Sequence, residues 1–126
     1  MIYEVLPIWE KGEYNGKKKD FEPTLAVYAL EGKKKRPTVL VCPGGGYAMT
    51  SQREAEPIAM RFLKEGYNAF ILYYSCEPNR HPQPLLDATR AMCMIRDNCE
   101  KWHVDPEKIA VIGFSAGFFF GNGSFF

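Results

Sequence analysis

The 126-residue sequence lacks several features that mark particular classes of protein. Its four cysteines include no C-x-x-C pair and it has only two histidines, so no zinc site of the usual spacing is predicted. No apolar run is long enough to cross a membrane, and the first ten residues do not resemble a signal peptide. A formal net charge of +1 gives no electrostatic reason to expect binding to nucleic acid.

What remains is the composition of a globular domain. Hydrophobic residues make up 46% of the chain and charged residues 25%, which suits one domain or part of one. Because they lack both zinc spacing and a C-x-x-C pair, Cys42, Cys76, Cys93 and Cys99 are interpreted as reduced structural thiols. We therefore expect a cytoplasmic protein.

Short apolar runs alternate with amphipathic segments along the chain. Strands are predicted at 2–8, 24–30, 38–42, 68–74 and 108–112, and helices at 53–65 and 83–102. The first two strands should pair antiparallel at one edge, and the others should form a parallel sheet through right-handed crossovers. Pro57 should lie in the first turn of its helix, and residues 104–107 should form a turn. The predicted fold class is α/β, a doubly wound and mostly parallel sheet with an antiparallel N-terminal edge.

Glycine-rich segments follow two of the predicted parallel strands. The first, Pro43-Gly44-Gly45-Gly46-Tyr47, lacks the Gly-Lys-Ser/Thr of a phosphate-binding loop, which leaves a flexible loop or an oxyanion-hole loop. The second, Gly113-Phe114-Ser115-Ala116-Gly117, fits G-x-S-x-G, a sharp strand-to-helix turn with serine at its tip. A plain glycine-flanked turn is the alternative. The carboxyl ends of parallel strands all lie at the same border of the sheet. Both segments are therefore expected there, beyond the carboxyl ends of their strands.

Few side chains are available to activate Ser115. No histidine or acidic residue follows it, and the two histidines are His81, in a proline-rich loop, and His103. His103 should lie at the opposite edge of the sheet, where His103 and Asp105 are interpreted as a surface turn. Asp87, near the start of a helix, is expected to cap that helix or face solvent. None of these residues is predicted to complete a catalytic triad.

In order and spacing these segments resemble an α/β-hydrolase, in particular the bacterial acetyl-xylan-esterase-like branch of carbohydrate esterases. The resemblance covers residues 38–117 and is carried by residues 41–47, 56–59, 66–70, 82–87, 102–106 and 113–117. It implies that Ser115 is the nucleophile, between the elbow glycines Gly113 and Gly117. It also implies that backbone amides of Gly45 or Gly46, together with Ala116, form the oxyanion hole, and Tyr47 is a candidate for substrate contact.

The resemblance also implies a substrate and the absence of a cofactor. Such families act on small-molecule esters, often acetylated sugars, and use neither a metal nor an organic cofactor. They take the acid and the histidine of the triad from chain after the serine, in domains of about 200–250 residues. We therefore expect the N-terminal half of a carboxylic-ester hydrolase, truncated after the nucleophile elbow and inactive alone.

The domain is expected to be divided into three parts. Residues 1–37 should supply the antiparallel edge, residues 38–117 the strand–helix core ending in the elbow, and residues 118–126 an atypical tail. A run of three phenylalanines at 118–120, followed by two glycines at 121 and 123, disfavours a helix in that tail. The alternatives to an esterase half are a non-catalytic remnant or binding module, and one part of a split esterase. An uncovered sheet edge would favour self-association.

Overall fold

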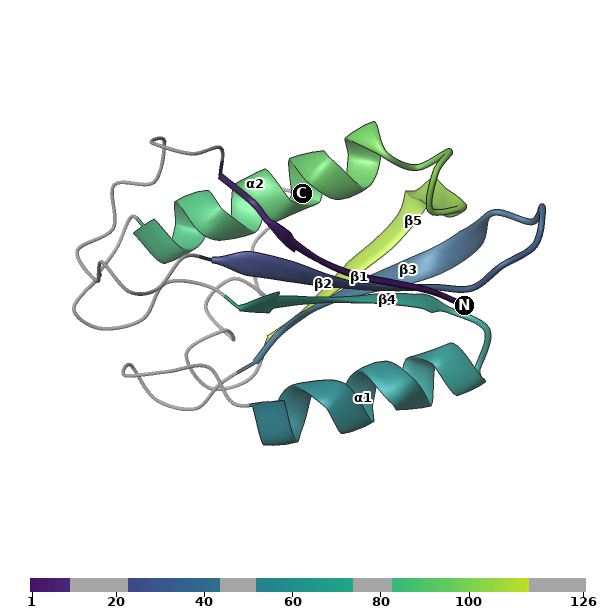
Figure 1. Ribbon diagram of the computed structural model, residues 1–126, viewed down its shortest axis with the longest axis horizontal. Helices are drawn as coiled ribbons and strands as arrows, with labels where there is room; N and C mark the ends of the chain where they lie inside the picture. Colours follow the sequence, from purple (N-terminus) through teal and green to yellow (C-terminus); the bar gives the residue numbers. More distant parts are fainter. Residues whose placement is uncertain (10–22, 44–51, 74–82, 114–126) are drawn as a thin grey trace.

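The computed structural model describes residues 1–9, 23–43, 52–73 and 83–113. In these ranges the strands are β1 (Ile2–Pro7), β2 (Thr24–Ala29), β3 (Arg36–Cys42), β4 (Asn68–Tyr73) and β5 (Val104–Gly113). The helices are α1 (Gln52–Lys64) and α2 (Gln83–Asp97). Figure 1 shows a single layer of strands with α2 against one face and α1 against the other. The predicted α/β class is therefore confirmed.

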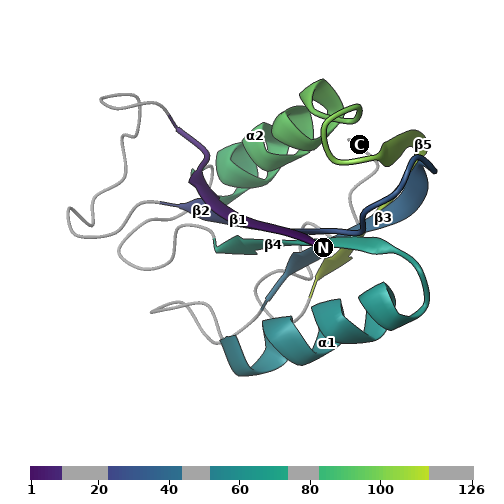
Figure 2. The ribbon, with the colours of Figure 1, turned by 45° about the vertical axis from the view of Figure 1, so that its right-hand side comes forward.

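The strands form one mixed sheet in the order β1-β2-β4-β3-β5. β1 pairs antiparallel with β2 and β2 antiparallel with β4, whereas β3 is parallel to both β4 and β5. The crossover through α1 runs from β3 to β4, and the crossover through α2 returns past β3 to β5. Since right-handed crossovers in opposite directions place their helices on opposite faces, the sheet is doubly wound, as Figure 2 also shows.

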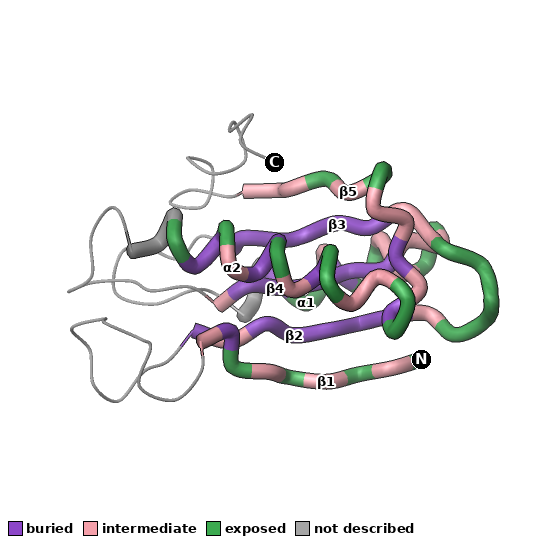
Figure 3. The backbone as a smooth tube through the Cα atoms, turned by 90° about the horizontal axis from the view of Figure 1, so that it is seen from above, coloured by how far each residue is buried: buried purple, intermediate pink, exposed green. Residues whose placement is uncertain are grey.

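The apolar core lies on both faces of the central strands. On the α2 face, Leu40, Phe70 and Leu72 are fully buried in a cluster with Ala88, Ala91, Ile95 and Trp102. On the α1 face, Val39, Val41, Ala69 and Ile71 are buried with Ala55 and Ala59. Because β3 and β4 are covered on both faces, their sequences are continuously apolar instead of alternating. Figure 3 shows the same contrast, with buried central strands between partly exposed outer strands.

Two local predictions were wrong. Pro57 lies inside α1, which begins at Gln52, and not in its first turn. Residues 104–107 belong to β5 and do not form a separate turn. The ladder pairs Arg36 with Val104 but Thr38 with Ile109, so residues 105–108 form a bulge opposite Pro37. The turn chemistry is retained in that bulge, where the Asp105 carboxylate accepts a hydrogen bond from the Glu107 amide at 3.0 Å.

The second helix is shorter than the predicted range of 83–102. α2 ends at Asp97, and a turn carries the chain to β5, with the Val104 amide donating to the Cys99 carbonyl at 2.9 Å. His103 has a positive φ of 54° in this turn, a conformation that lets the chain reverse direction. Trp102 is buried in the core although it lies outside the helix.

Candidate active site

β3 and β5 end side by side at the carboxyl edge of the sheet, by which we mean the edge where the parallel strands end. The parallel ladder pairs Val41 with Ile112 and Cys42 with Gly113. Pro43 follows Cys42 directly, so the two glycine-rich segments leave the sheet from paired positions on adjacent strands. β4 ends at this edge too, because Val41 also pairs with Ile71 in a parallel ladder. Figure 3 shows the three strand ends together.

This place in the sheet is a topological switch point. The chain leaving β3 leads to α1 on one face, and the chain leaving β4 leads to α2 on the other. In open α/β sheets, the diverging connections at such a point leave a crevice beyond the strand ends, where ligands bind. The carboxyl edge next to β3 is therefore the place to expect chemistry in this fold.

Most of the predicted site residues lie outside the described ranges. These are Gly45, Gly46, Tyr47, Ser115, Ala116 and Gly117, together with His81. Their roles remain predictions from the sequence. Gly113 is described, and it is the partly exposed last residue of β5.

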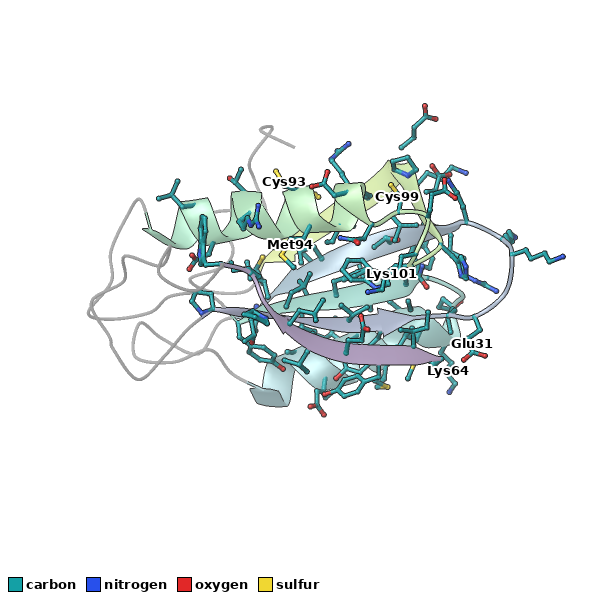
Figure 4. All side chains as sticks on the ribbon, turned by 45° about the horizontal axis from the view of Figure 1, so that its top comes forward. Glu31, Lys64, Cys93, Met94, Cys99 and Lys101 are labelled. Atoms are coloured by element: carbon teal, nitrogen blue, oxygen red, sulfur yellow. The ribbon has the colours of Figure 1, made fainter. Side chains whose placement is uncertain are left out.

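Cys42 ends β3 beside this edge, but it is not a rival nucleophile. Its side chain is fully buried, and that burial raises the pKa of the thiol to about 12. Because only the thiolate is a good nucleophile, this cysteine is inert at neutral pH. Cys93 and Cys99 are also free thiols, and Figure 4 shows Cys93 on the outer side of α2. Within the described ranges no three His, Cys, Asp or Glu side chains are grouped to hold a metal ion.

His103 and Asp105 lie away from the carboxyl ends of β3 and β5. His103 precedes β5 at the opposite edge, as predicted, and its carbonyl accepts hydrogen bonds from the Arg36 amide at 2.9 Å and the Asn68 side chain at 3.1 Å. Asp105 is held in the bulge of β5. Neither residue can therefore meet a serine that follows the carboxyl end of β5.

The expectation that Asp87 would cap its helix or face solvent was wrong. Asp87 is fully buried, and its Oδ1 accepts a hydrogen bond of 2.8 Å from the indole Nε1 of Trp9. Arg90 lies one turn further along α2, donates from Nε to the Ile8 carbonyl at 2.7 Å, and places its guanidinium 5.9 Å from the centre of the Trp9 ring. These contacts fasten the chain after β1 to α2.

Sequence reasoning missed this Trp9–Asp87–Arg90 cluster. Trp9 is about eighty positions away from Asp87 and Arg90 in the chain, so no local pattern joins it to them. The only available signal was an acid and an arginine three residues apart on one side of a helix, which is common on solvent-facing helices.

The comparisons with known proteins agree with the fold. The chain matches the family model BD-FAE over residues 25–121. Endo-1,4-beta-xylanase B of Butyrivibrio fibrisolvens is 42% identical over 115 residues, which cover 87% of this chain and 18% of that protein. The acetylxylan esterase of Xylanibacter ruminicola is 32% identical over 76 residues, which cover 60% of this chain and 16% of that protein.

Two crystal structures are similar over most of this chain. The acetyl ester-xyloside bifunctional hydrolase from Caldicellulosiruptor lactoaceticus has a TM-score of 0.84 and 39% identity, and the match covers 90% of this chain and 43% of the hydrolase chain. An alpha/beta hydrolase enzyme from a Medee basin deep-sea metagenome library has a TM-score of 0.81 and 43% identity, and the match covers 93% of this chain and 48% of that enzyme's chain. The chain thus spans less than half of these structures and less than a fifth of the two curated relatives. It belongs to the BD-FAE family, and its fold is part of the α/β-hydrolase fold.

Proposed function

We propose that this chain carries the nucleophile side of a serine carboxylic-ester hydrolase. Ser115 is the nucleophile, and backbone amides of Ala116 and of Gly45 or Gly46 hold the oxyanion. One observation above all supports this proposal, the pairing of Cys42 with Gly113 in a parallel ladder. Because of this pairing, both glycine-rich segments begin at the ends of adjacent strands. A nucleophile and its oxyanion donors must lie close together in this way to act on one carbonyl group.

The proposed reaction proceeds through an acyl-enzyme. The Ser115 hydroxyl attacks the ester carbonyl while a histidine takes its proton, and the developing negative charge on the carbonyl oxygen is held by the two backbone amides. The histidine gives this proton to the alcohol oxygen as the alcohol leaves. Water, deprotonated by the same histidine, then attacks the acyl-enzyme and releases the acid, and the proton returns to Ser115. The described part of the chain places no histidine at the carboxyl edge, and no histidine or acidic residue follows Ser115. In this proposal, the general base and its acid therefore come from residues beyond these 126.

The proposed substrates are short acyl esters, with acetylated carbohydrates as the preferred class. The names of two relatives support this choice, since one is an acetylxylan esterase and another an acetyl ester-xyloside hydrolase. We further propose that Tyr47, which directly follows the three glycines, contacts the substrate. An aromatic ring next to an oxyanion loop can pack against the apolar face of a sugar ring.

A chimera tests this proposal. Residues 1–117 are joined to the remaining part of the Caldicellulosiruptor hydrolase, and hydrolysis of p-nitrophenyl acetate and acetylated xylan is measured. We expect the chimera to be active, and Ser115→Ala to lower kcat by about 10⁴–10⁶-fold, as loss of a triad serine does elsewhere. Cys93→Ala is the control, because Cys93 is an exposed nucleophilic side chain on α2, away from both motifs, and it should leave the rate unchanged.

The unextended chain is measured in the same assay. It should hydrolyse p-nitrophenyl acetate no faster than its own Ser115→Ala variant, because a serine hydroxyl without a base is a weak nucleophile. Ser115-dependent turnover by the unextended chain would refute the prediction that this chain is inactive by itself. It would direct attention to His81 as the base. A folded chimera whose rate is indifferent to Ser115→Ala would refute the esterase assignment and favour a binding module.

A further inference from the structure

The chain after β1 carries a partly exposed tryptophan, Trp9, to the carboxyl edge of the sheet. β1 and β4 run in the same direction, because each is antiparallel to β2. Pro7 and Tyr73, the last residues of β1 and β4, both pair with Thr24, and Trp9 follows two residues after Pro7. Figure 1 shows the end of β1 next to α2. Trp9 therefore lies at the same edge as the proposed esterase site, and it packs on the α2 face.

The ring of Trp9 is held in one orientation from inside the fold. Asp87 accepts the hydrogen bond of its indole N–H at 2.8 Å, and the Arg90 guanidinium lies 5.9 Å from the ring centre. Asp87 is fully buried, and burying a carboxyl group costs free energy that an apolar contact between β1 and α2 would not. What the carboxyl group adds is a fixed rotation of the indole. The cluster therefore presents a rigid and partly exposed aromatic ring.

Arg90 adds hydrogen-bond donors beside this ring. Its Nε donates to the Ile8 carbonyl at 2.7 Å, and its two Nη groups make no hydrogen bond within the part of the chain that the structure describes. Four of the five N–H donors of a guanidinium are on these Nη groups. A sugar ring has apolar faces and a rim of hydroxyl groups. An aromatic ring beside unused donors can therefore bind a sugar through both features.

Trp9 lies too far from the proposed nucleophile to contact the sugar that carries the ester. In the order β1-β2-β4-β3-β5, β1 is three strand positions from β3 and four from β5. At the usual spacing between strands these separations are about 14 Å and about 19 Å. Such a span exceeds the length of one sugar ring. A sugar bound at Trp9 must therefore belong to a chain of several sugars, of which another member carries the acetyl group.

We propose that Trp9 and Arg90, positioned by Asp87, form a distal subsite for one sugar of a xylan chain. This inference rests on the proposed esterase function and deepens it, because it makes the substrate an acetylated oligosaccharide or polysaccharide and not a single acetylated sugar. The subsite binds and does no chemistry. Because its contacts are the same in the ground state and the transition state, they lower KM and leave kcat unchanged.

Binding of unacetylated xylohexaose to the 126-residue chain tests the subsite without any chemistry at Ser115. The chain has two tryptophans and Trp102 is only 1% exposed, so a saturable change in tryptophan fluorescence is expected to report on Trp9. By titration calorimetry, Trp9→Ala should raise the dissociation constant about tenfold or more. Trp9→Phe, which preserves most of the packing, should raise it less. Tyr3→Ala is the matched control, because Tyr3 is a 57% exposed aromatic residue of β1 away from the carboxyl edge, and it should change nothing.

Two substitutions of Asp87 test its positioning role. Asp87→Asn keeps an oxygen acceptor for the indole N–H and should bind xylohexaose nearly as well as the original chain. Asp87→Leu removes the acceptor and should weaken binding in the same direction as Trp9→Ala. Equal binding by both variants would show that Asp87 does not position the ring.

The chimera separates failure of this subsite from failure of the esterase assignment. Trp9→Ala should lower the ratio of kcat/KM for acetylated xylohexaose to kcat/KM for p-nitrophenyl acetate about tenfold, through KM for the oligosaccharide. Tyr3→Ala should leave this ratio unchanged. Equal loss on both substrates, or no binding of xylohexaose, would overturn the subsite and leave the esterase assignment standing. Trp9-dependent binding in a chimera without Ser115-dependent activity would support the subsite and count against the esterase assignment.

Discussion

At the scale of the residue, Asn68 shows how one buried amide joins separate parts of the fold. Its side chain is fully buried at the start of β4. Oδ1 accepts a hydrogen bond from the Leu30 amide at 2.7 Å, and Nδ2 donates to the carbonyls of Trp102 at 2.9 Å and His103 at 3.1 Å. The amide thus ties the end of β2 to the turn before β5. The sequence placed Asn68 at a strand start but gave no sign of these partners, which are 34 to 38 positions away.

Replacement of this side chain should be costly. We expect Asn68→Ala to lower the free energy of unfolding by about 2–4 kcal/mol, because it leaves buried backbone groups without partners. Asn98→Ala is the matched control. The Asn98 amide donates to the Met94 carbonyl at 2.8 Å in a more exposed turn, and its loss should cost less than about 1 kcal/mol. Urea unfolding of both variants measures the difference, and equal losses would contradict the role given to Asn68.

At the scale of the element, apolar periodicity predicted every described strand and helix. Two predictions that relied on proline and aspartate, the position of Pro57 in its helix and the turn at 104–107, were wrong. Pro57 was expected in a first turn because a later position loses a backbone hydrogen bond. Its side chain is exposed in α1, so water can reach the carbonyl that lacks its amide partner. Residues 104–107 have the composition of a turn. However, β5 pairs with β3 at Val104 and again from Ile109, so the residues between them form a bulge within the strand. In β5, pairing with β3 outweighed a local preference for a turn.

The proline in α1 should reduce stability. Pro57→Ala restores one helical hydrogen bond, and we expect it to raise the free energy of unfolding by about 1–3 kcal/mol. Pro106→Ala is the matched control in the bulge of β5, where no regular ladder bond is available to restore, and it should give no gain. Thermal or urea unfolding measures both. A Pro57→Ala variant no more stable than the original would show that α1 accommodates the proline without loss.

At the scale of the whole molecule, the doubly wound sheet with an antiparallel N-terminal edge could be predicted because few rules decide it. Right-handed crossovers fix which face each helix covers, and parallel strands bring their carboxyl ends to one edge. The ladder between β3 and β5 confirms that the segments after Cys42 and Gly113 start together. The Trp9–Asp87–Arg90 cluster could not be predicted, because it depends on side-chain packing between β1 and α2. The roles of Gly45, Gly46, Ser115 and Ala116 remain predictions.

The most direct test of the central claim, that the segments after β3 and β5 form one site, is a crystal structure of the chimera after reaction with a p-nitrophenyl phosphonate. Such an ester phosphonylates an activated serine and leaves an oxygen where the oxyanion would form. We predict phosphorus bonded to Ser115 Oγ, with its oxygen about 2.7–3.1 Å from the backbone nitrogens of Ala116 and of Gly45 or Gly46. Phosphonylation of another residue, or an oxygen that no amide of residues 44–46 reaches, would contradict the account.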